Sequence, residues 1–208
     1  MKRLLLLGMT ALLLTGCSVE DDDYRLLQSM SSQSDKEADE YEGIWSIDGT
    51  PLPSTYTVML SRGYIMFNTF PYYDVLERLI GGLTMPMQTK VYQLKEELAD
   101  YNVTEPDRTV FLPYTSVGQS DYSTYNELIP ATADNSYQVI TFGLSKDDGQ
   151  QLTVSFDLVA NLSTIVSTAN ELTCILTIGQ LTITDSDGEQ YHIDRGCQLT
   201  FTSTKKTK

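Results

Sequence analysis

Few residues of this chain carry nucleophilic or metal-binding chemistry, and Cys17 has the most specific surroundings among them. The 208 residues include three cysteines and one histidine. Cys17 directly follows Gly16 and an apolar run from Leu4 to Leu14, and the basic pair Lys2-Arg3 precedes that run. A basic tip, a short apolar stretch and a small residue before the cut are typical of an export signal. The sequence therefore predicts that residues 1–16 are a signal peptide.

The residues around this cut resemble the bacterial lipobox, here Leu14-Thr15-Gly16-Cys17. In that motif the cysteine thiol is joined to diacylglycerol, and signal peptidase II cuts before the cysteine. The resemblance implies lipid attachment at Cys17, cleavage between Gly16 and Cys17, and a membrane partner reached through the acyl chains. The apolar run is 11 residues long, whereas a membrane-spanning helix needs about 20. We therefore expect no transmembrane anchor at this end.

Four carboxylates follow the predicted anchor, at Glu20 and from Asp21 to Asp23. Runs of like charge stay solvated and extended, and the polar stretch up to Glu40 has little periodicity. We therefore expect residues 17–40 to form an acidic, flexible tether. The run also resembles the acidic export signal of Bacteroidetes lipoproteins, which implies display on the outer face of the outer membrane. An anchor that faces the periplasm is the alternative.

The net charge excludes nucleic acid as an expected partner. Removal of residues 1–16 takes away Lys2 and Arg3 and no acid, so 12 basic residues remain beside 28 acidic ones, a net charge of −16. Such a surface repels phosphate backbones and anionic lipid headgroups. The acyl chains must then supply the attachment to the membrane.

Residues 41–204 are predicted to form one mainly β domain, followed by a short basic tail at 205–208. Alternating apolar residues and turn residues such as Asp48-Gly49 separate the chain into short strands. The expected strands are 43–47, 56–60, 64–68, 109–114, 137–144, 151–159, 172–184 and 189–202. In the next-to-last strand the apolar phase changes at Gly179, which indicates a bulge. The fold class predicted is a single antiparallel calycin-like barrel, or a related sandwich, with a short helix.

Three segments between the strands have other patterns. Pro71 to Ile80 is predicted to be a helix, because its apolar residues form one stripe and Gly81 follows it. Val91 to Leu98 fits either a helix or a strand. Thr115 to Asn135 is predicted to be a long polar loop that contains tyrosines, and loops of that length are candidates for binding.

Trp45 carries the second resemblance. The first strand begins Gly43-Ile44-Trp45, which resembles the Gly-x-Trp start of lipocalins and other calycins. There the tryptophan closes the base of an up-and-down barrel that binds a small hydrophobic molecule. Together with the lipobox and the acidic run, the whole chain resembles the uncharacterised calycin-like lipoproteins of gut Bacteroidetes. The alternative is that Trp45 is simply the largest residue of the core.

The sequence gives little support for a catalytic site or a metal site. A histidine-based triad depends entirely on His192, which strand alternation turns away from its apolar neighbours. A zinc site needs several His or Cys ligands. The segment Asp185 to Glu189 matches only part of a calcium loop and is predicted to be a hairpin turn. We therefore expect no metal, no cofactor and no enzymatic activity.

Cys174 and Cys197 leave the question of a disulfide open. A hairpin around Ser186-Asp187 makes the two cysteines diagonal neighbours on one face, roughly 7–8 Å apart. A bulge at Gly179 or Gly196 brings them within reach of a bond. Two buried free thiols are the alternative.

The function expected is therefore binding without catalysis. Trp45, Tyr114, Tyr122 and Tyr125 are the candidate ligand-binding residues, since aromatic side chains suit sugars, peptides and apolar ligands. The leading hypothesis is a cell-surface lipoprotein that binds a small ligand, a glycan or a protein partner. The alternative is an accessory or anchor subunit of a fimbria or outer-membrane complex. It predicts an exposed sheet edge or a donor strand, such as the Gln198 to Thr204 segment, in place of a cavity.

The lipid anchor makes a first testable prediction. Cells that express the wild-type chain should incorporate a radiolabelled fatty acid into this protein, and the Cys17→Ala variant should not, because it lacks the acceptor thiol. Labelling followed by immunoprecipitation measures the difference. Equal incorporation in both would remove the basis for the predicted location.

Overall fold

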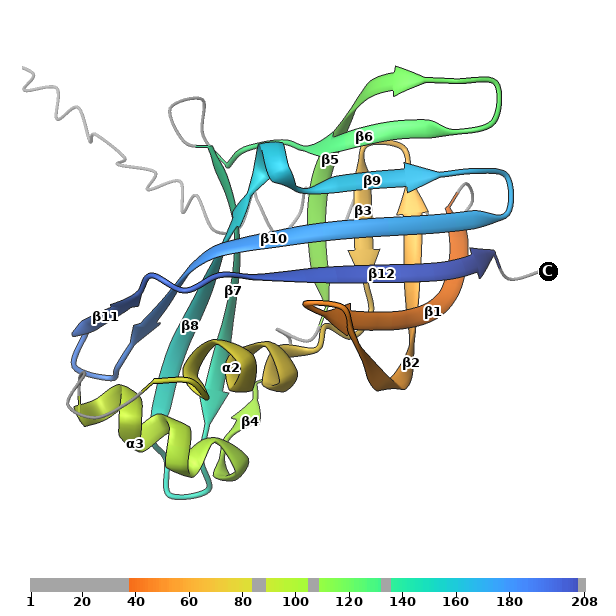
Figure 1. Ribbon diagram of the computed structural model, residues 1–208. Helices are drawn as coiled ribbons and strands as arrows, with labels where there is room; N and C mark the ends of the chain where they lie inside the picture. The colour runs from red at the N-terminus through yellow and green to blue at the C-terminus, as the bar shows by residue number, and fades with distance from the viewer. Residues whose placement is uncertain (1–37, 84–88, 105–108, 132–135, 206–208) are drawn as a thin grey trace, which may run out of the picture. The chain divides into compact units, whose positions relative to one another are not determined.

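The computed structural model describes residues 38–83, 89–104, 109–131 and 136–205, which belong to one compact unit (Figure 1). The expected signal peptide, most of the tether and residues 206–208 lie outside these ranges. The prediction of a mainly β, antiparallel fold with few helices is confirmed. The strands are β1 Asp39–Ile47, β2 Thr50–Ser61, β3 Tyr64–Phe67, β4 Asn102–Val103, β5 Val110–Gln119, β6 Thr124–Leu128, β7 Tyr137–Ser145, β8 Gln151–Val159, β9 Thr164–Ser167, β10 Glu171–Thr184, β11 Gln190–Ile193 and β12 Cys197–Lys205. The helices are α2 Tyr72–Ile80 and α3 Thr89–Glu97, with 3₁₀ turns at Leu98–Asp100 and Ala160–Leu162.

Eight of the strands close into a ring. The ring order is β1-β2-β3-β5-β6-β9-β10-β12, and β12 pairs with β1 to complete it. All of these pairs are antiparallel, and ring neighbours follow one another in the chain apart from the β4, β7–β8 and β11 excursions. Gly43 allows the closing pair to approach, because a Cβ there would overlap the backbone and Cβ of Ser203. This is a meander closed on itself, as in up-and-down barrels.

The ring opens at one end because the two halves of β10 pair with different strands of the same sheet. Its first half pairs with β9 and β12, whereas its second half pairs with β8 and β11. The register of β10 against β8 shifts between Ile178 and Gln180. The bulge predicted at Gly179 is therefore confirmed. Beyond it, β7, β8, β10 and β11 splay away from the ring, and α2 and α3 lie against this part of the molecule (Figure 1).

Helix α2 confirms the sequence prediction. Pro71 precedes the helix, and the Gly81 N–H donates to Glu77 O at 2.8 Å. Its buried residues are the apolar stripe itself, namely Tyr72, Val75, Leu76, Leu79 and Ile80. The ambiguous segment that follows is also a helix, α3, which buries Val91 and Leu94 on one side. A spacing of three residues puts both on the same helical face.

The prediction of a long polar loop from Thr115 to Asn135 is wrong. The β5–β6 hairpin occupies most of this segment, with a turn in which Ser120 N–H donates to Ser123 O at 2.8 Å. The last five residues of this hairpin's first strand are intermediate or exposed throughout. The alternation of buried and exposed residues that signals a strand is therefore missing from the sequence here. Residues 132–135 lie outside the described ranges.

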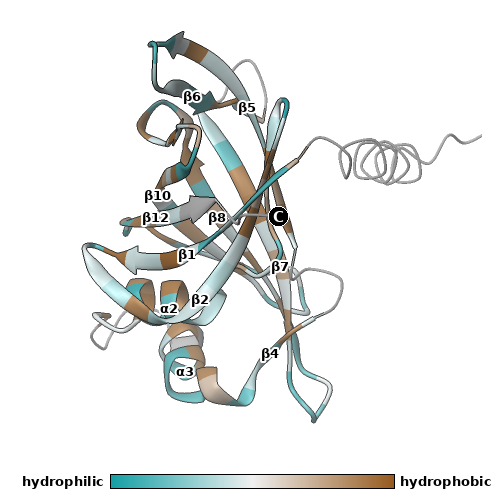
Figure 2. Ribbon diagram, turned by 90° about the vertical axis from the view of Figure 1, so that its right-hand side faces the viewer, coloured by the Kyte–Doolittle hydropathy of each residue, from teal (hydrophilic) through white to brown (hydrophobic). Residues whose placement is uncertain are grey.

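Trp45 lies at the centre of an aromatic core. It has no exposed surface, and its ring centroid is 5.3 Å from those of Phe67 and Phe201 and 5.9 Å from that of Phe70. Figure 2 shows apolar residues in the strands and in both helices around this interior. Trp45 is therefore packed as the core residue that the alternative interpretation predicted, and it is not among the residues that line the cavity at the open end of the ring.

The core role of Trp45 makes a second prediction. Trp45→Ala should lower the free energy of unfolding by about 3–5 kcal/mol, because it leaves a large cavity among packed rings. Urea unfolding followed by far-UV circular dichroism measures the change. Tyr122→Ala is the matched control, since Tyr122 is 85% exposed and surface changes stay within about 0.5 kcal/mol. Equal stability of the two variants would contradict this packing.

Candidate functional site

The candidate site is a cavity of about 180 Å³ at the open end of the ring. It lies between α3, the β7–β8 turn and the β10–β11 turn. Its lining residues are Val91, Gln93, Leu94, Tyr101, Gln150, Gln151, Leu152, Ile183, Asp185, Ser186, Asp187 and Tyr191. These residues are distant in sequence, so only the tertiary fold brings them together.

The floor of the cavity is apolar. Val91 and Leu94 come from the buried face of α3, and Ile183 comes from the inward face of β10. Leu152 of β8 packs against the core while it faces the cavity. Burial of an apolar ligand surface against such a floor contributes about 25 cal/mol per Å². The cavity can therefore bind an apolar body by ordinary hydrophobic contact.

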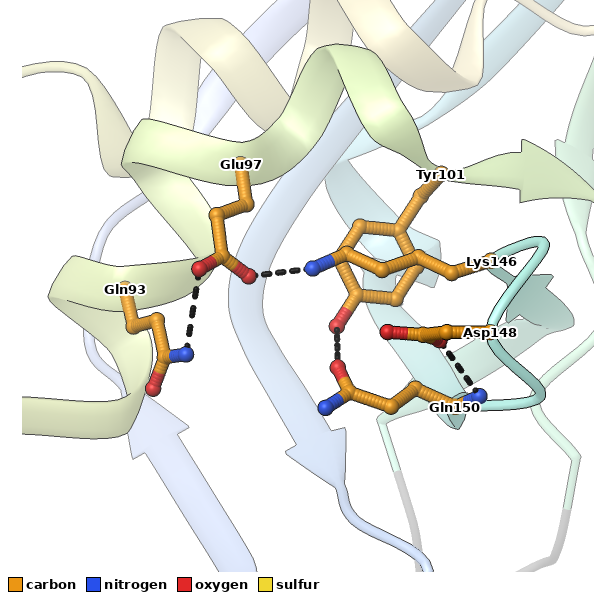
Figure 3. Close-up of polar contacts among 6 residues, drawn as sticks. All are labelled: Gln93, Glu97, Tyr101, Lys146, Asp148 and Gln150. Atoms are coloured by element: carbon orange, nitrogen blue, oxygen red, sulfur yellow. Dashed lines mark hydrogen bonds and ion pairs between the residues drawn. The ribbon is translucent and has the colours of Figure 1, made fainter.

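One wall of the cavity is fixed by a polar network (Figure 3). Lys146, in the β7–β8 turn, forms an ion pair with Glu97 and lies 4.7 Å from the centre of the Tyr101 ring. Gln93 Nε2 donates to Glu97 Oε1 at 3.1 Å. The Tyr101 hydroxyl donates to Gln150 Oε1 at 3.2 Å. Gln93 is therefore held by a contact within α3, whereas Tyr101 and Gln150 are held by a contact between the segment after α3 and the β7–β8 turn.

The network also pairs Lys146 with a carboxylate. The hydrogen bond from Lys146 lowers the pKa of Glu97, and the same bond raises the pKa of Lys146. Burial raises the pKa of Tyr101, so its phenol stays protonated at neutral pH. The lining itself contains two carboxylates, Asp185 and Asp187, and no Lys or Arg. The cavity therefore favours neutral or cationic ligands over anions.

The β10–β11 turn confirms the turn predicted from Asp185 to Glu189. Asp185 Oδ1 accepts from the N–H groups of Asp187 and Glu189, each at 3.0 Å. Its other oxygen accepts from the Tyr191 hydroxyl at 3.4 Å. The carboxylate is thus used to hold the turn and one cavity residue. Within the described ranges, no group of three or more His, Cys, Asp or Glu side chains is placed to hold a metal ion.

The aromatic residues predicted to bind ligand do not lie in this cavity. Tyr114 points into the ring, where its hydroxyl donates to Ser61 O at 2.6 Å. Tyr122 and Tyr125 are exposed on the β5–β6 hairpin, far from α3 along the ring (Figure 1). The sequence did not predict the residues that line the cavity, because Gln and Leu are common residue types that do not by themselves indicate a binding site. The only available signal was the apolar face of the 91–98 segment.

Cys174 and Cys197 are both free and buried, so the disulfide hypothesis is wrong. The predicted register placed Cys197 opposite Leu176, whereas it lies opposite Ile178. Cys174 lies opposite Phe201. Four residues along β10 separate the two positions, about 13 Å of strand, which is too far for a disulfide.

His192 is exposed on β11, as strand alternation predicted. Its Nδ1 lies 3.0 Å from the Thr182 hydroxyl on the neighbouring strand. Because it is on the outer face of the sheet, it does not face the cavity. No histidine therefore takes part in this site, and the cavity has no base of the kind that a triad requires.

The size of the cavity limits its ligand. A buried cavity of about 150 Å³ holds benzene, while drug-sized ligands occupy about 300–1,000 Å³. The volume here therefore suits a ligand with one small ring. Two larger hollows, one around Arg78 and Asp48 and one between α2 and α3, are more open to solvent. In the first, the two side chains already bind each other through Arg78 Nε and Asp48 Oδ2 at 2.6 Å.

Comparison with known proteins adds no family to this description. No protein-family model, curated protein or solved structure matches the chain. What the structure defines is therefore a class by architecture, an antiparallel β ring with one open, helix-covered end. Among the described residues, none of the helices has both the length and the apolar character needed to cross a bilayer.

The free cysteines make a third prediction. Burial raises the pKa of Cys197 to about 12 and raises that of Cys174 further, so neither forms the reactive thiolate at neutral pH. A Cys17→Ala variant, whose remaining cysteines are these two, should react slowly with Ellman's reagent when native and should release two thiols in denaturant. Adding Cys174→Ala to this variant should leave one. Absence of free thiols in the denatured Cys17→Ala variant would indicate the disulfide instead.

Proposed function

We propose that this protein is a non-enzymatic, lipid-anchored cell-surface lipoprotein whose calycin-like domain binds a small ligand in the cavity at its open end. The single observation that supports this is the combination of an apolar floor with a polar rim in a preformed hollow. Small-molecule sites have this composition, with apolar walls and few polar groups. The lipobox resemblance and the acidic run supply the proposed location.

The ligand we propose is a neutral or cationic molecule with one small ring. Leu94, Leu152 and Ile183 contact the ring, and Gln93 or Gln150 hydrogen-bonds to its polar substituent. The carboxylate of Asp187 favours an amine or hydroxyl group at the rim and disfavours a carboxylate. The closed core around Trp45 supports this end cavity over the ring interior as the place of binding.

The alternative, an accessory subunit of a surface fibre, lacks its expected strand. Strand β12 contains the Gln198 to Thr204 segment, and it pairs with β1 on one side and β10 on the other. A strand paired on both edges has no free ladder to donate to another chain. The donor-strand form of this alternative therefore has no support from the pairing of β12. The edge of β7, of which β4 covers only Leu144 and Ser145, is a sheet edge that this alternative could use.

The proposed function makes a fourth prediction, tested with three probes that share one ring and differ in charge. Ligand-observed NMR on the full chain should detect benzylamine and phenol, with dissociation constants of about 1 mM for ligands of this size. Benzoate should bind at least several-fold more weakly because of the acidic rim. Asp187→Asn should reduce the preference for benzylamine over benzoate.

A substitution that fills the cavity provides the control. Leu152→Trp should abolish binding of benzylamine and phenol, because the indole occupies the floor. Leu162→Trp introduces the same residue at a position that is 57% exposed, and it should bind as the wild type does. Absence of binding by the wild type, or unchanged binding by Leu152→Trp, would refute the proposed site.

A further inference from the structure

The outer face of β7, β8, β10 and β11 is a second polar surface. Alternation along these strands turns Phe142, Phe156 and Ile183 inward, toward the helices, and turns the residues between them outward. In both views the described helices lie on the inner side of this part of the sheet (Figures 1 and 2). The outer face therefore lies on the opposite side of the sheet from the cavity.

Polar side chains cross this face in two ordered rows. In the first row Asp157 lies opposite Gln180, whose Nε2 donates to Asp194 Oδ1 at 2.8 Å. In the second row the strand registers align Thr141, Ser155, Thr182 and His192. The Thr141 and Ser155 hydroxyls are 3.0 Å apart, and Thr182 Oγ1 lies 3.0 Å from His192 Nδ1. Neighbouring strands thus present hydrogen-bonding groups about 4.8 Å apart.

An aromatic ring lies beside these rows. A Cβ built on Gly179 would lie 3.4 Å from Tyr137 Cε1 and 2.9 Å from Val159 Cγ2. Tyr137 is on β7 and Gly179 is on β10, with β8 between them. A ring that reaches across an intervening strand lies along the sheet. Tyr137 is 38% exposed, and the missing side chain at Gly179 leaves room for its ring.

The charges on this face exclude an anionic partner. The two rows contain Asp157 and Asp194 and no Lys or Arg. Burial raises the pKa of Asp157, and the nearby His192 lowers it. Phosphate, sulfate or carboxylate groups would meet carboxylates here without a compensating cation. The many hydroxyl, amide and carboxylate groups suit a neutral ligand rich in hydroxyls.

We propose that this outer face binds a neutral, flat, β-linked oligosaccharide. The apolar face of one sugar ring stacks on Tyr137, and its hydroxyls bind Asp157 and Gln180. The next sugar along the chain reaches Thr182 and His192. The two rows are two residues apart along the strands, about 6.7 Å, so an extended chain that follows the strand direction can place successive sugars on successive rows, whereas a coiled chain turns away from them. This site is separate from the cavity proposed above and does not depend on it.

Calorimetric titration of the full-chain protein with cellohexaose, a flat β-1,4 chain, tests this proposal. Maltohexaose has the same sugars in α linkage and a coiled shape, and it should bind more weakly. Tyr137→Ala should weaken cellohexaose binding about tenfold or more, as loss of an aromatic anchor does. Gln180→Ala, which keeps the ring, should weaken it several-fold and covers the case in which Tyr137→Ala does not fold.

Two controls separate this site from other surfaces. Tyr125→Ala removes a comparably exposed tyrosine from β6 and should leave cellohexaose binding unchanged. Leu152→Trp, which fills the cavity, should also leave it unchanged, so that failure of either proposal is seen independently. Absence of cellohexaose binding by the wild type, or equal binding by Tyr137→Ala and Tyr125→Ala in folded protein, would overturn the proposal.

Discussion

The pairing of β1 with β12 is the constraint on which the rest of the structure depends. It joins the two ends of the described domain, and it leaves β12 paired on both sides. Gly43 makes the approach possible, and Trp45 two residues later lies opposite Phe201, so closure and core packing occur at the same place. A closed ring has no long free edge, so its eight strands are protected from pairing with other chains, whereas β7, outside the ring, is covered on its second side only by the two residues of β4.

The bulge at Gly179 has the opposite effect at the other end of the molecule. The bulge changes the register of β10, and the second half of this strand then pairs with β8 and β11, which together with β7 lie outside the ring. The space between this group and the ring is filled by α2 and α3. Both proposed sites arise from this divergence: the cavity on the inner side of the splayed strands, and the polar rows on their outer side.

Sequence reasoning succeeded where burial follows a simple period. The apolar stripe of α2, the phase change at Gly179 and the turn at Asp185 are local patterns, and the structure contains all three. It failed where the pattern is weak or the partner is remote. The exposed β5–β6 hairpin has no apolar alternation, and the register of β10 against β12 lies two residues away from the one that a regular hairpin would have. A shift of two residues was enough to separate Cys174 from Cys197.

The sequence by itself determined the antiparallel β class, the position of α2 and the turns, and it carries the untested prediction of lipid attachment at Cys17. These depend on neighbouring residues, whose spacing encodes period, turn geometry and an export pattern. Only the tertiary structure decided that the ring closes, that Trp45 is sealed in the core, and which residues line the cavity. Gln93, Gln150 and Tyr191 come from three separate elements. Their meeting depends on strand register and helix docking, which are set by long-range packing that no local pattern records.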